Sequence, residues 1–313
     1  MSCVTSIYLR QSGEMARLSV IIPTNNRAEW LPGAVDSVLD QGVNDLELIV
    51  VDDGSEDDSE AALGNQRKKL RYIRTKYGGV AAARNRGIAA ANGEFIAFLD
   101  SDDRFVPGKL ARQVEFMAAR PRALISHTDE VWYRRGRFLN QKKVHARPDG
   151  YIFSQCLSRC CVGMSTVMVR PRFFELVGGF DPSYPCCEDY ELWLRAAVIL
   201  PFALLPLPLT IKNGGRTDQL SVIHRMGMDR FRVRALNELI GKVPLSDGQD
   251  AAARRELAVK AAIYGRGCLK HGRVEEGRRY LEIAEQARRF RVVRWPVSPD
   301  DRSRRPLPGH RRG

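Results

Sequence analysis

Short apolar runs alternate with longer amphipathic segments over the first hundred residues, and this alternation constrains the fold more than any other feature. Four runs have the length and apolar composition of buried strands: 18–22, 46–51, 70–74 and 95–99. Helical spacing of apolar residues over 29–39 and an Ala-rich stretch over 79–91 lie between them. Strands that alternate with helices in this way predict an α/β fold with a doubly wound, mostly parallel sheet.

The pattern loosens after Pro107-Gly108. The further elements that we expect are a helix over 109–119, strands over 123–133, 137–141 and 165–169, and a helix over 188–197. The apolar stretch 196–211 contains Pro201, Pro206 and Pro208, so it is interpreted as a buried strand with its connections rather than as a membrane span. From Leu236 onward the sequence is typical of helices, with 261–269 and 274–287 resembling a helical hairpin.

This organisation predicts three parts of the chain. Residues 15–240 form one α/β domain, and residues 241–287 form a C-terminal helical appendage. Residues 288–313 are rich in Arg and Pro and are expected to be a basic, disordered tail.

Charge and cysteine content narrow the function classes. The net charge of +13 favours anionic partners such as nucleotide phosphates, membrane surfaces or nucleic acid. The seven cysteines are odd in number and lack a C-x-x-C repeat, which favours free thiols over a disulfide framework or a zinc cluster. The first twenty residues lack the continuous apolar core of a signal peptide. We therefore expect a cytoplasmic protein.

Polar side chains follow three of the predicted strands at the point where each strand ends. The three segments are Pro23-Thr24-Asn25-Asn26-Arg27, Asp52-Asp53-Gly54-Ser55 and Asp100-Ser101-Asp102-Asp103. Ligands of open α/β sheets bind beyond the carboxyl ends of the strands, so these segments predict one shared crevice. Asp100 and Asp102 project to the same side of an extended chain, and two close carboxylates favour a Mg²⁺ or Mn²⁺ ion that also binds diphosphate oxygens. The alternative for each segment is an ordinary acidic turn.

Six segments, in order along the chain, carry a family resemblance: Ser19-Val20-Ile21-Ile22-Pro23-Thr24 with Asn26-Arg27, Val50-Val51-Asp52-Asp53-Gly54-Ser55, Ala82-Ala83-Arg84-Asn85-Arg86-Gly87, Phe98-Leu99-Asp100-Ser101-Asp102-Asp103, Gly178-Gly179-Phe180-Asp181 and Glu188-Asp189-Tyr190-Glu191-Leu192-Trp193. With these segments the sequence resembles the family 2 glycosyltransferases of the GT-A fold. The resemblance covers about residues 18–239, and the ordered series is more specific than any single motif.

The resemblance implies an inverting transferase that uses a nucleotide sugar, usually UDP-linked, together with Mg²⁺ or Mn²⁺. By position, the donor-binding residues would be Pro23, Thr24, Arg27, Asp53, Arg84, Asp100 and Ser101. Asp102 would bind the metal ion, and the pair Glu188-Asp189 would supply the general base on the acceptor side. Inversion by direct displacement needs such a base to deprotonate the attacking hydroxyl. Which of the two acts is open, with Asp189 preferred, and both can also simply cap a helix.

A third metal ligand and the phosphate contacts are less well defined. His224 lies on a segment that closes over the diphosphate in some family members, so it is a candidate metal ligand, but a lone His is as often merely exposed or hydrogen-bonded. Lys212, Arg216 and Arg225 are alternative contacts to the phosphates.

The acceptor expected is a glycan or a lipid-linked molecule that receives a single sugar. The Arg-rich tail is interpreted as a peripheral contact to an anionic membrane at the cytoplasmic face, and a tail that only adds solubility is the open alternative. A nucleotidyltransferase is the nearest rival, but a Gly-rich phosphate loop with Lys is missing after the first strand. A nucleic-acid-binding protein is a weaker alternative, because no nucleic-acid motif accompanies the positive charge and we expect no nucleic-acid partner.

Overall fold

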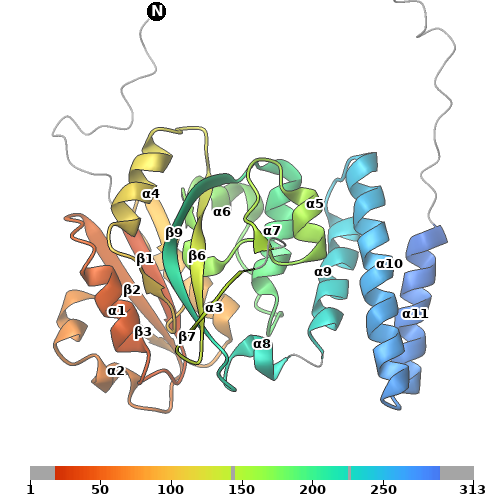
Figure 1. The fold of residues 1–313 in the computed structure, drawn as a ribbon, viewed down its shortest axis with the longest axis horizontal. Helices are drawn as coiled ribbons and strands as arrows, with labels where there is room; N and C mark the ends of the chain where they lie inside the picture. The colour runs from red at the N-terminus through yellow and green to blue at the C-terminus, as the bar shows by residue number, and fades with distance from the viewer. Residues whose placement is uncertain (1–17, 142–144, 225–226, 290–313) are drawn as a thin grey trace, which may run out of the picture.

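The computed structural model describes residues 18–141, 145–224 and 227–289. Three predictions concern residues outside these ranges: the start of the α/β domain at residue 15, the phosphate contact of Arg225, and most of the basic tail. One mixed sheet organises the chain, with strand order β3-β2-β1-β4-β8-β6-β9-β5, and β7 pairs with β6. Figure 1 shows this sheet on one side of the molecule and the last two helices at the other end.

The first half of the sheet is parallel, as the sequence predicts. Its strands are β1 (Leu18–Thr24), β2 (Leu46–Asp53), β3 (Arg71–Thr75) and β4 (Phe95–Phe98). The connecting helices are α1 (Leu31–Leu39), α2 (Ser59–Ala62), the 3-10 helix Gly64–Lys69 and α3 (Val80–Ala90). All seven residues of β1 are buried, because helices cover both faces of the sheet.

Side chains of β1 alternate between two hydrophobic cores. Val20 and Ile22 pack in a cluster with residues of α1 and of α4 (Lys109–Ala118), whereas Ile21 packs with Ala81 of α3 in the larger cluster on the opposite face. This alternation follows from the two-residue repeat of a strand. The doubly wound arrangement is therefore confirmed for this half of the sheet.

The second half of the sheet is mixed. Its strands are β5 (Arg104–Phe105), β6 (Ile125–Arg134), β7 (Arg137–Leu139), β8 (Met168–Val169) and β9 (Ala203–Gly214). β8 is antiparallel to both β4 and β6, and β5 is antiparallel to β9. β9 runs parallel to β6, with register shifts on either side of the pair Asp129 and Pro208, the first of which skips Pro206. A proline has no N–H to donate to a strand ladder, which explains the irregular pairing.

The strand predicted over 165–169 is only two residues long. A 3-10 helix, Met164–Thr166, occupies its first part. The hydroxyl of Ser165 accepts a hydrogen bond from the backbone N–H of Asp100 (3.0 Å) and donates one to Asp103 (2.7 Å). Side-chain hydrogen bonds of this kind compete with a regular strand ladder, so the apolar pattern overestimated the strand.

The remaining helices follow in chain order. They are α4 (Lys109–Ala118), α5 (Phe153–Ser158), α6 (Arg172–Val177), α7 (Glu188–Ile199), α8 (Leu220–Ile223), α9 (Met228–Lys242), α10 (Asp247–Lys270) and α11 (Val274–Arg289). None of the helices in the described residues is both long enough and apolar enough to cross a membrane.

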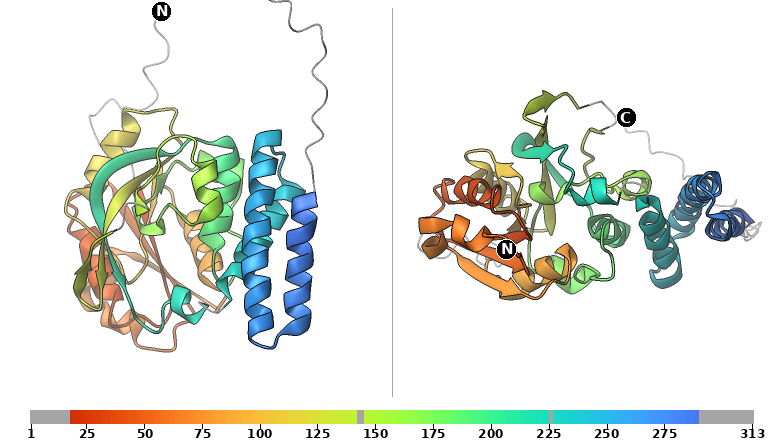
Figure 2. Two further views of the ribbon diagram at one scale, coloured as in Figure 1. Left: turned by 45° about the vertical axis from the view of Figure 1, so that its right-hand side comes forward. Right: turned by 90° about the horizontal axis from the view of Figure 1, so that it is seen from below.

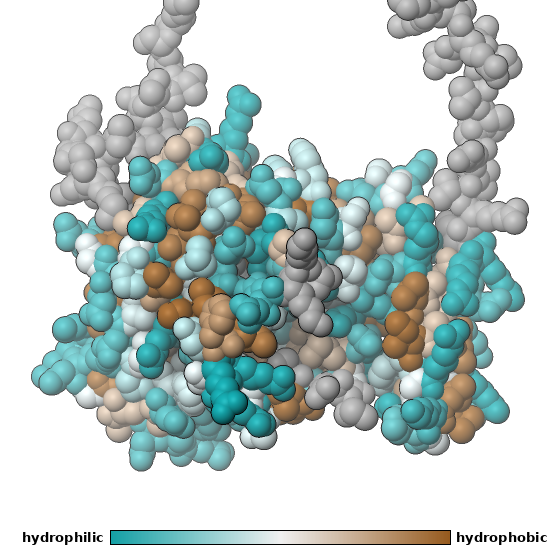
Figure 3. Space-filling view, viewed as in Figure 1, coloured by the Kyte–Doolittle hydropathy of each residue, from teal (hydrophilic) through white to brown (hydrophobic). Residues whose placement is uncertain are grey.

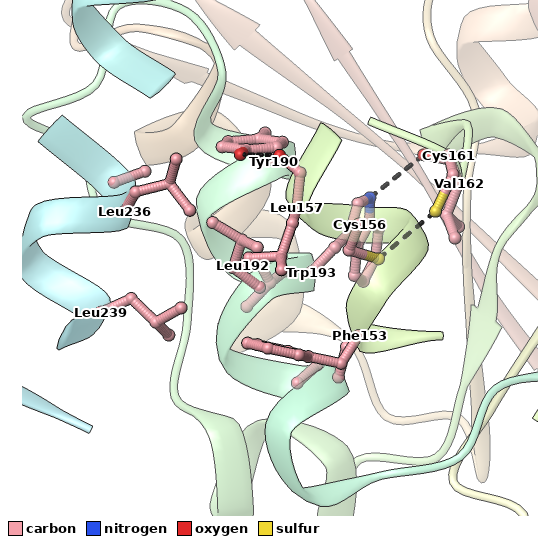
Figure 4. Packing of buried hydrophobic residues seen from close by; sticks show 14 of the residues in the cluster. Phe153, Cys156, Leu157, Cys161, Val162, Tyr190, Leu192, Trp193, Leu236 and Leu239 are labelled. Atoms are coloured by element: carbon pink, nitrogen blue, oxygen red, sulfur yellow. Dashed lines mark hydrogen bonds between the residues drawn. The ribbon is translucent and has the colours of Figure 1, made fainter. Parts of the chain in front are cut away.

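The core around α7 holds that helix firmly in place. The indole N–H of Trp193 donates to the carbonyl of Val162 (3.1 Å), and the hydroxyl of Tyr190 donates to the carbonyl of Leu157 (2.6 Å). Figure 4 shows both side chains packed between α5 and the leucines of α9. The first turn of α7 carries Glu188 and Asp189, so this packing fixes where the two carboxylates lie.

The C-terminal helical hairpin is confirmed, although α10 begins fourteen residues before the predicted 261. A capping box of Ser246 and Gln249 starts the helix. A Cβ on Gly265 would lie 2.9 Å from the carbonyl oxygen of Gly277, so glycines allow the two helix backbones to approach. Figure 2 shows the hairpin beside α9, away from α1 and α2. Figure 3 shows hydrophobic patches among hydrophilic side chains on this part of the surface.

The division into three parts at 240 and 287 remains a prediction. The first boundary lies within α9, and the second lies within the last turn of α11.

Candidate active site

One cleft of about 810 Å³ lies beyond the carboxyl ends of β1, β2 and β4. Its lining includes every residue predicted for donor binding and catalysis, and one of the two predicted metal ligands, Asp102: Pro23, Thr24, Arg27, Asp53, Arg84, Asp100, Ser101, Asp102, Glu188 and Asp189. Five separate parts of the chain contribute these side chains. The fold thus brings the candidate donor side and the candidate acceptor side into one space.

Asp53 orders the loop that leads into α3. Its two carboxylate oxygens accept hydrogen bonds from the backbone N–H groups of Gly78 (2.8 Å) and Gly79 (2.7 Å). The carboxylate that we predict to contact the nucleotide sugar therefore already accepts two backbone hydrogen bonds. Each of its oxygens keeps a second lone pair for the nucleotide sugar. Thr24, on the neighbouring strand, has a buried hydroxyl without a hydrogen-bond partner among the described residues. An unpartnered polar atom at the wall of a cleft fits contact with a ligand.

Arg84 joins the two sides of the cleft. Its guanidinium lies 2.8 Å from Asp100 on the donor side and 2.5 Å from Glu188 on the acceptor side. The guanidinium carbon also lies 5.4 Å from the centre of the Phe180 ring. Burial alone would lower the pKa of Arg84, but the two carboxylates outweigh burial and raise it, so Arg84 stays charged. Arg84 is thus a structural bridge, besides being a candidate donor contact.

The segment after β4 contains carboxyls in contrasting environments. Burial acts to raise the pKa of Asp100, but the cations of Arg84 and Lys212 outweigh it and hold that pKa below its ordinary value. Burial raises the pKa of Asp103 well above its ordinary value, and the charges of Asp102 and Asp100 add to this effect against Lys212. The carboxylate of Asp103 accepts hydrogen bonds from the hydroxyl of Ser165 (2.7 Å) and from the backbone N–H of Asn213 (3.1 Å). These contacts attach the segment after β4 to its neighbours.

Asp102 has a cationic partner from this chain. Oδ2 of Asp102 accepts a hydrogen bond from Nη2 of Arg216 in an ion pair. The backbone carbonyl of Asp102 accepts a hydrogen bond from the side chain of Asn213 (3.0 Å). The described residues contain no cluster of three His, Cys, Asp or Glu side chains that could bind a metal ion. Mg²⁺ usually takes only one or two protein carboxylates and completes its shell with substrate phosphates and water. Asp102 is one carboxylate that lines the cleft, so it could supply the protein ligand that such an ion needs.

Glu188 and Asp189 differ in their surroundings. Glu188 is buried and paired with Arg84, and burial raises its pKa, assisted by the charge of Asp189 and opposed by Arg84. Asp189 is half-buried. One of its oxygens accepts the backbone N–H of Tyr190 (2.6 Å), and the other accepts the thiol of Cys160 (3.1 Å). No basic side chain in the described residues forms an ion pair with Asp189, so its carboxylate is the more accessible of the two to a hydroxyl in the cleft.

His224 is not among the residues that line the cleft. It follows α8 and its ring lies edge-on to Phe231, with 6.0 Å between the ring centres. The structure does not bring it to Asp102 in the way that it brings the other predicted residues together, and its metal role stays a prediction. Of the three alternative phosphate contacts, Lys212 lines the cleft, Arg216 is not among its lining residues but pairs with Asp102, and Arg225 lies outside the described residues.

Two contacts of the site were missed by sequence reasoning. Cys160 lines the cleft and contacts Asp189, yet its position next to Cys161 indicated only an idle thiol. The sequence predicts Arg216 only as a phosphate contact, because its ion-pair partner Asp102 lies 114 residues away in the sequence. The one signal in the sequence that points to a site role for Arg216 is its positive charge directly after β9.

Comparisons with known proteins bear on this geometry. The family model described as glycosyl transferase family 2 matches residues 19–163. The chain is 32% identical over 191 residues to the Escherichia coli protein named UDP-Glc:alpha-D-GlcNAc-diphosphoundecaprenol beta-1,3-glucosyltransferase WfaP, covering 58% of this chain and 70% of that protein. The chain belongs to glycosyltransferase family 2.

Other members of the family differ in length. An uncharacterized glycosyltransferase of Rickettsia felis is 38% identical over 185 residues, which are 58% of this chain and 30% of that protein. The chain therefore spans only about a third of the length of this relative. Membership in glycosyltransferase family 2 supports sugar transfer over the nucleotidyltransferase and nucleic-acid-binding hypotheses.

Solved structures confirm the predicted fold. S. aureus TarS 1–349 in complex with UDP-GlcNAc superposes with a TM-score of 0.57 at 17% identity, covering 89% of this chain and 95% of that one. The mannosyltransferase PcManGT from Pyrobaculum calidifontis, in complex with GDP-Man and Mn²⁺, gives a TM-score of 0.59 at 16% identity, covering 87% and 85%. The family 2 glycosyltransferase described here thus has the GT-A type of α/β fold with a helical C-terminal region.

Proposed function

We propose that this glycosyltransferase moves one sugar from a UDP-linked donor to a hydroxyl of a glycan or lipid-linked acceptor, with inversion and with the help of Mg²⁺ or Mn²⁺. The observation that carries the proposal is the shared cleft, in which Arg84 bridges Asp100 on the donor side and Glu188 beside the candidate base. Support for the donor comes from TarS, whose solved structure contains UDP-GlcNAc.

The donor side would be built by the ends of the parallel strands. Thr24, Arg27 and Asp53 would contact the base and ribose, with Pro23 and Ser101 shaping the pocket and Asp100 near the ribose. Support comes from the unpartnered hydroxyl of Thr24 and from the position of all these residues in one cleft. Arg27 also pairs with Asp218 (2.7 Å), so donor entry would have to accommodate this ion pair.

Asp102 would hold the divalent ion together with oxygens of the donor diphosphate. When bound, such an ion supplies positive charge to the nucleoside diphosphate leaving group. The mannosyltransferase structure that contains Mn²⁺ supports a metal-assisted reaction.

Asp189 would act as the general base. It would accept the proton of the acceptor hydroxyl while that oxygen forms its bond to the anomeric carbon. The bond from the anomeric carbon to the diphosphate breaks on the opposite face, so the configuration inverts and UDP leaves. The half-exposed carboxylate of Asp189 supports Asp189 as the base over Glu188, whose carboxylate forms an ion pair with Arg84.

The acceptor and the location are proposed from relatives. The printed name of the E. coli relative specifies a diphosphoundecaprenol-linked acceptor, which supports a lipid-linked acceptor here. We accordingly place the enzyme in the cytoplasm, with peripheral contact to the inner membrane face through the Arg-rich tail. That tail lies almost wholly outside the described residues and its membrane contact stays a prediction.

A donor screen tests the proposal. Thermal unfolding of the full chain is measured with UDP-, GDP- and dTDP-sugars, each with and without Mn²⁺. Transfer from the same donors to a polyprenyl-diphosphate sugar is assayed on separate, unheated samples. A donor at 100 times its dissociation constant should stabilise the fold by about 2.7 kcal/mol. Stabilisation by UDP-sugars only with Mn²⁺, and a product of inverted anomeric configuration by NMR, is the expected result. Stabilisation by GDP-sugars alone, or retained configuration, would contradict it.

A further inference from the structure

The carboxylate that we propose for metal binding is already neutralised by the chain itself. Arg216 pairs with Asp102 through Nη2, and its Nε lies 3.1 Å from Asp218. The side chains of Arg216 and Asp102 are only 16% and 17% exposed, so water screens the pair less than it screens a surface ion pair. The guanidinium carbon also lies 4.6 Å from the centre of the Trp30 ring, which adds a cation–π contact.

The segment that carries Arg216 is braced, and we call residues 213–219 the strap. The side chain of Gln219 donates to the carbonyl of Asn213 (3.0 Å) and accepts the N–H of Gly215 (2.9 Å), which closes the strap on itself. Its far end is tied to the first strand's loop by the ion pair of Arg27 with Asp218 (2.7 Å). These contacts place Arg216 on Asp102 without any ligand.

We infer that Arg216 is a built-in counterion of Asp102, which competes with a divalent cation for this carboxylate and so makes metal binding depend on the donor diphosphate. The inference rests on the proposed role of Asp102. Nη1 of Arg216 is buried and finds no hydrogen-bond partner among the described residues, so the guanidinium has a donor to spare for an anion. Asp102 and Asp218, its two carboxylate partners, both line the cleft into which the diphosphate would enter.

Simple electrostatics gives the direction of the effect. Without a nucleotide, a metal ion at Asp102 must displace a guanidinium and then remain close to its positive charge. A diphosphate changes this balance, because its oxygens can take the guanidinium in a bidentate contact and can also bind the metal ion. Metal and diphosphate then favour each other's binding by the same factor, as linkage requires.

Mn²⁺ binding measures the effect without any turnover. Mn²⁺ is titrated into the full chain and the free ion is followed by electron paramagnetic resonance, first without nucleotide and then with UDP. Arg216→Gln should bind Mn²⁺ at least about tenfold more tightly than the wild type in the absence of UDP. UDP should strengthen Mn²⁺ binding strongly in the wild type and much less in Arg216→Gln.

Two control variants make the outcome decisive. Arg216→Lys keeps the charge and should keep weak nucleotide-free Mn²⁺ binding, and the double variant Asp102→Asn with Arg216→Gln should lose the gain. Equal nucleotide-free affinity in wild type and Arg216→Gln would overturn the inference. If UDP still promoted Mn²⁺ binding in that case, and Asp102→Asn abolished it, the proposed function would stand. A gain that survived Asp102→Asn would overturn both the inference and the metal assignment.

Discussion

Arg84 and Glu188 form a buried ion pair, with 2.5 Å between Nη1 and Oε1 and side chains only 4% and 7% exposed. The two residues are 104 positions apart, one on α3 and the other in the first turn of α7. The second guanidinium nitrogen lies 2.8 Å from Asp100. One cation thus links the nucleotide-binding half of the sheet to the helix that carries the candidate base.

Removal of the Arg84 charge should destabilise the fold. Arg84→Gln leaves Glu188 without its buried cationic partner, and a broken buried pair typically costs about 3–5 kcal/mol. Urea unfolding should therefore show a lower free energy of unfolding for Arg84→Gln. The double variant with Glu188→Gln should recover part of the loss, because no unpaired charge is then buried at that position. A loss below about 1 kcal/mol for Arg84→Gln would mean that the pair is not the link described here.

The candidate base can be separated from its neighbour by a pair of isosteric variants. Asp189→Asn should lower the rate of transfer by roughly a hundredfold or more, the usual contribution of a general base, and should change donor affinity by no more than a few fold. Glu188→Gln should instead lower both stability and donor affinity through Arg84. Steady-state transfer assays and calorimetry with UDP distinguish the two. Unchanged transfer by Asp189→Asn, with loss of transfer in Glu188→Gln at full stability, would assign the base to Glu188.

The thiol of Cys160 should orient the candidate base. Its hydrogen bond to Asp189 (3.1 Å) is removed in Cys160→Ala and kept in Cys160→Ser. A hydrogen bond to a charged group contributes about 1.5–3 kcal/mol, so kcat should fall by roughly tenfold or more in the alanine variant. The KM for the donor should not change, and serine should restore most of the rate. Equal kcat for wild type and Cys160→Ala would show that the thiol has no positioning role.

The sequence predicted the parallel half of the sheet well, because its signals are local. β1 is a continuous run of buried residues, and polar residues follow it directly at Asn25 and Asn26. Since the carboxyl ends of parallel strands meet at one edge, the meeting of Asp53 with Asp100 in one cleft follows from strand order alone.

The missed features depend on contacts between distant parts of the chain. No local pattern links Cys160 to Asp189 or Arg216 to Asp102, because the partners belong to different elements that only the fold brings together. The short β8 has the same origin, since Ser165 satisfies Asp100 and Asp103 instead of extending a strand. The early start of α10 is different, because the capping box of Ser246 and Gln249 was visible in the sequence.

Lys109 should make stability depend on pH in the alkaline range. Its side chain is fully buried, its Nζ has no hydrogen-bond partner among the described residues, and it lies 4.0 Å from the centre of the Phe105 ring. Burial lowers the pKa of Lys109 to about 7. Below that pH, both the folded and the unfolded chain carry the proton. Between about pH 7 and the ordinary lysine pKa of about 10.4, only the unfolded chain binds it, so the free energy of unfolding should rise by up to about 1.4 kcal/mol per pH unit.

Comparison with Lys109→Met isolates this effect from other titrating groups. Methionine has a similar shape and no charge to bury, so the variant should be more stable than the wild type at pH 7. Its advantage should shrink as the pH rises toward 10, because the wild-type lysine then becomes neutral in both states. Urea unfolding of both proteins from pH 6 to pH 10 measures the difference, with Lys270→Met on the exposed end of α10 as the matched control. A constant difference between wild type and Lys109→Met across this range would mean that Lys109 keeps its proton in the folded protein.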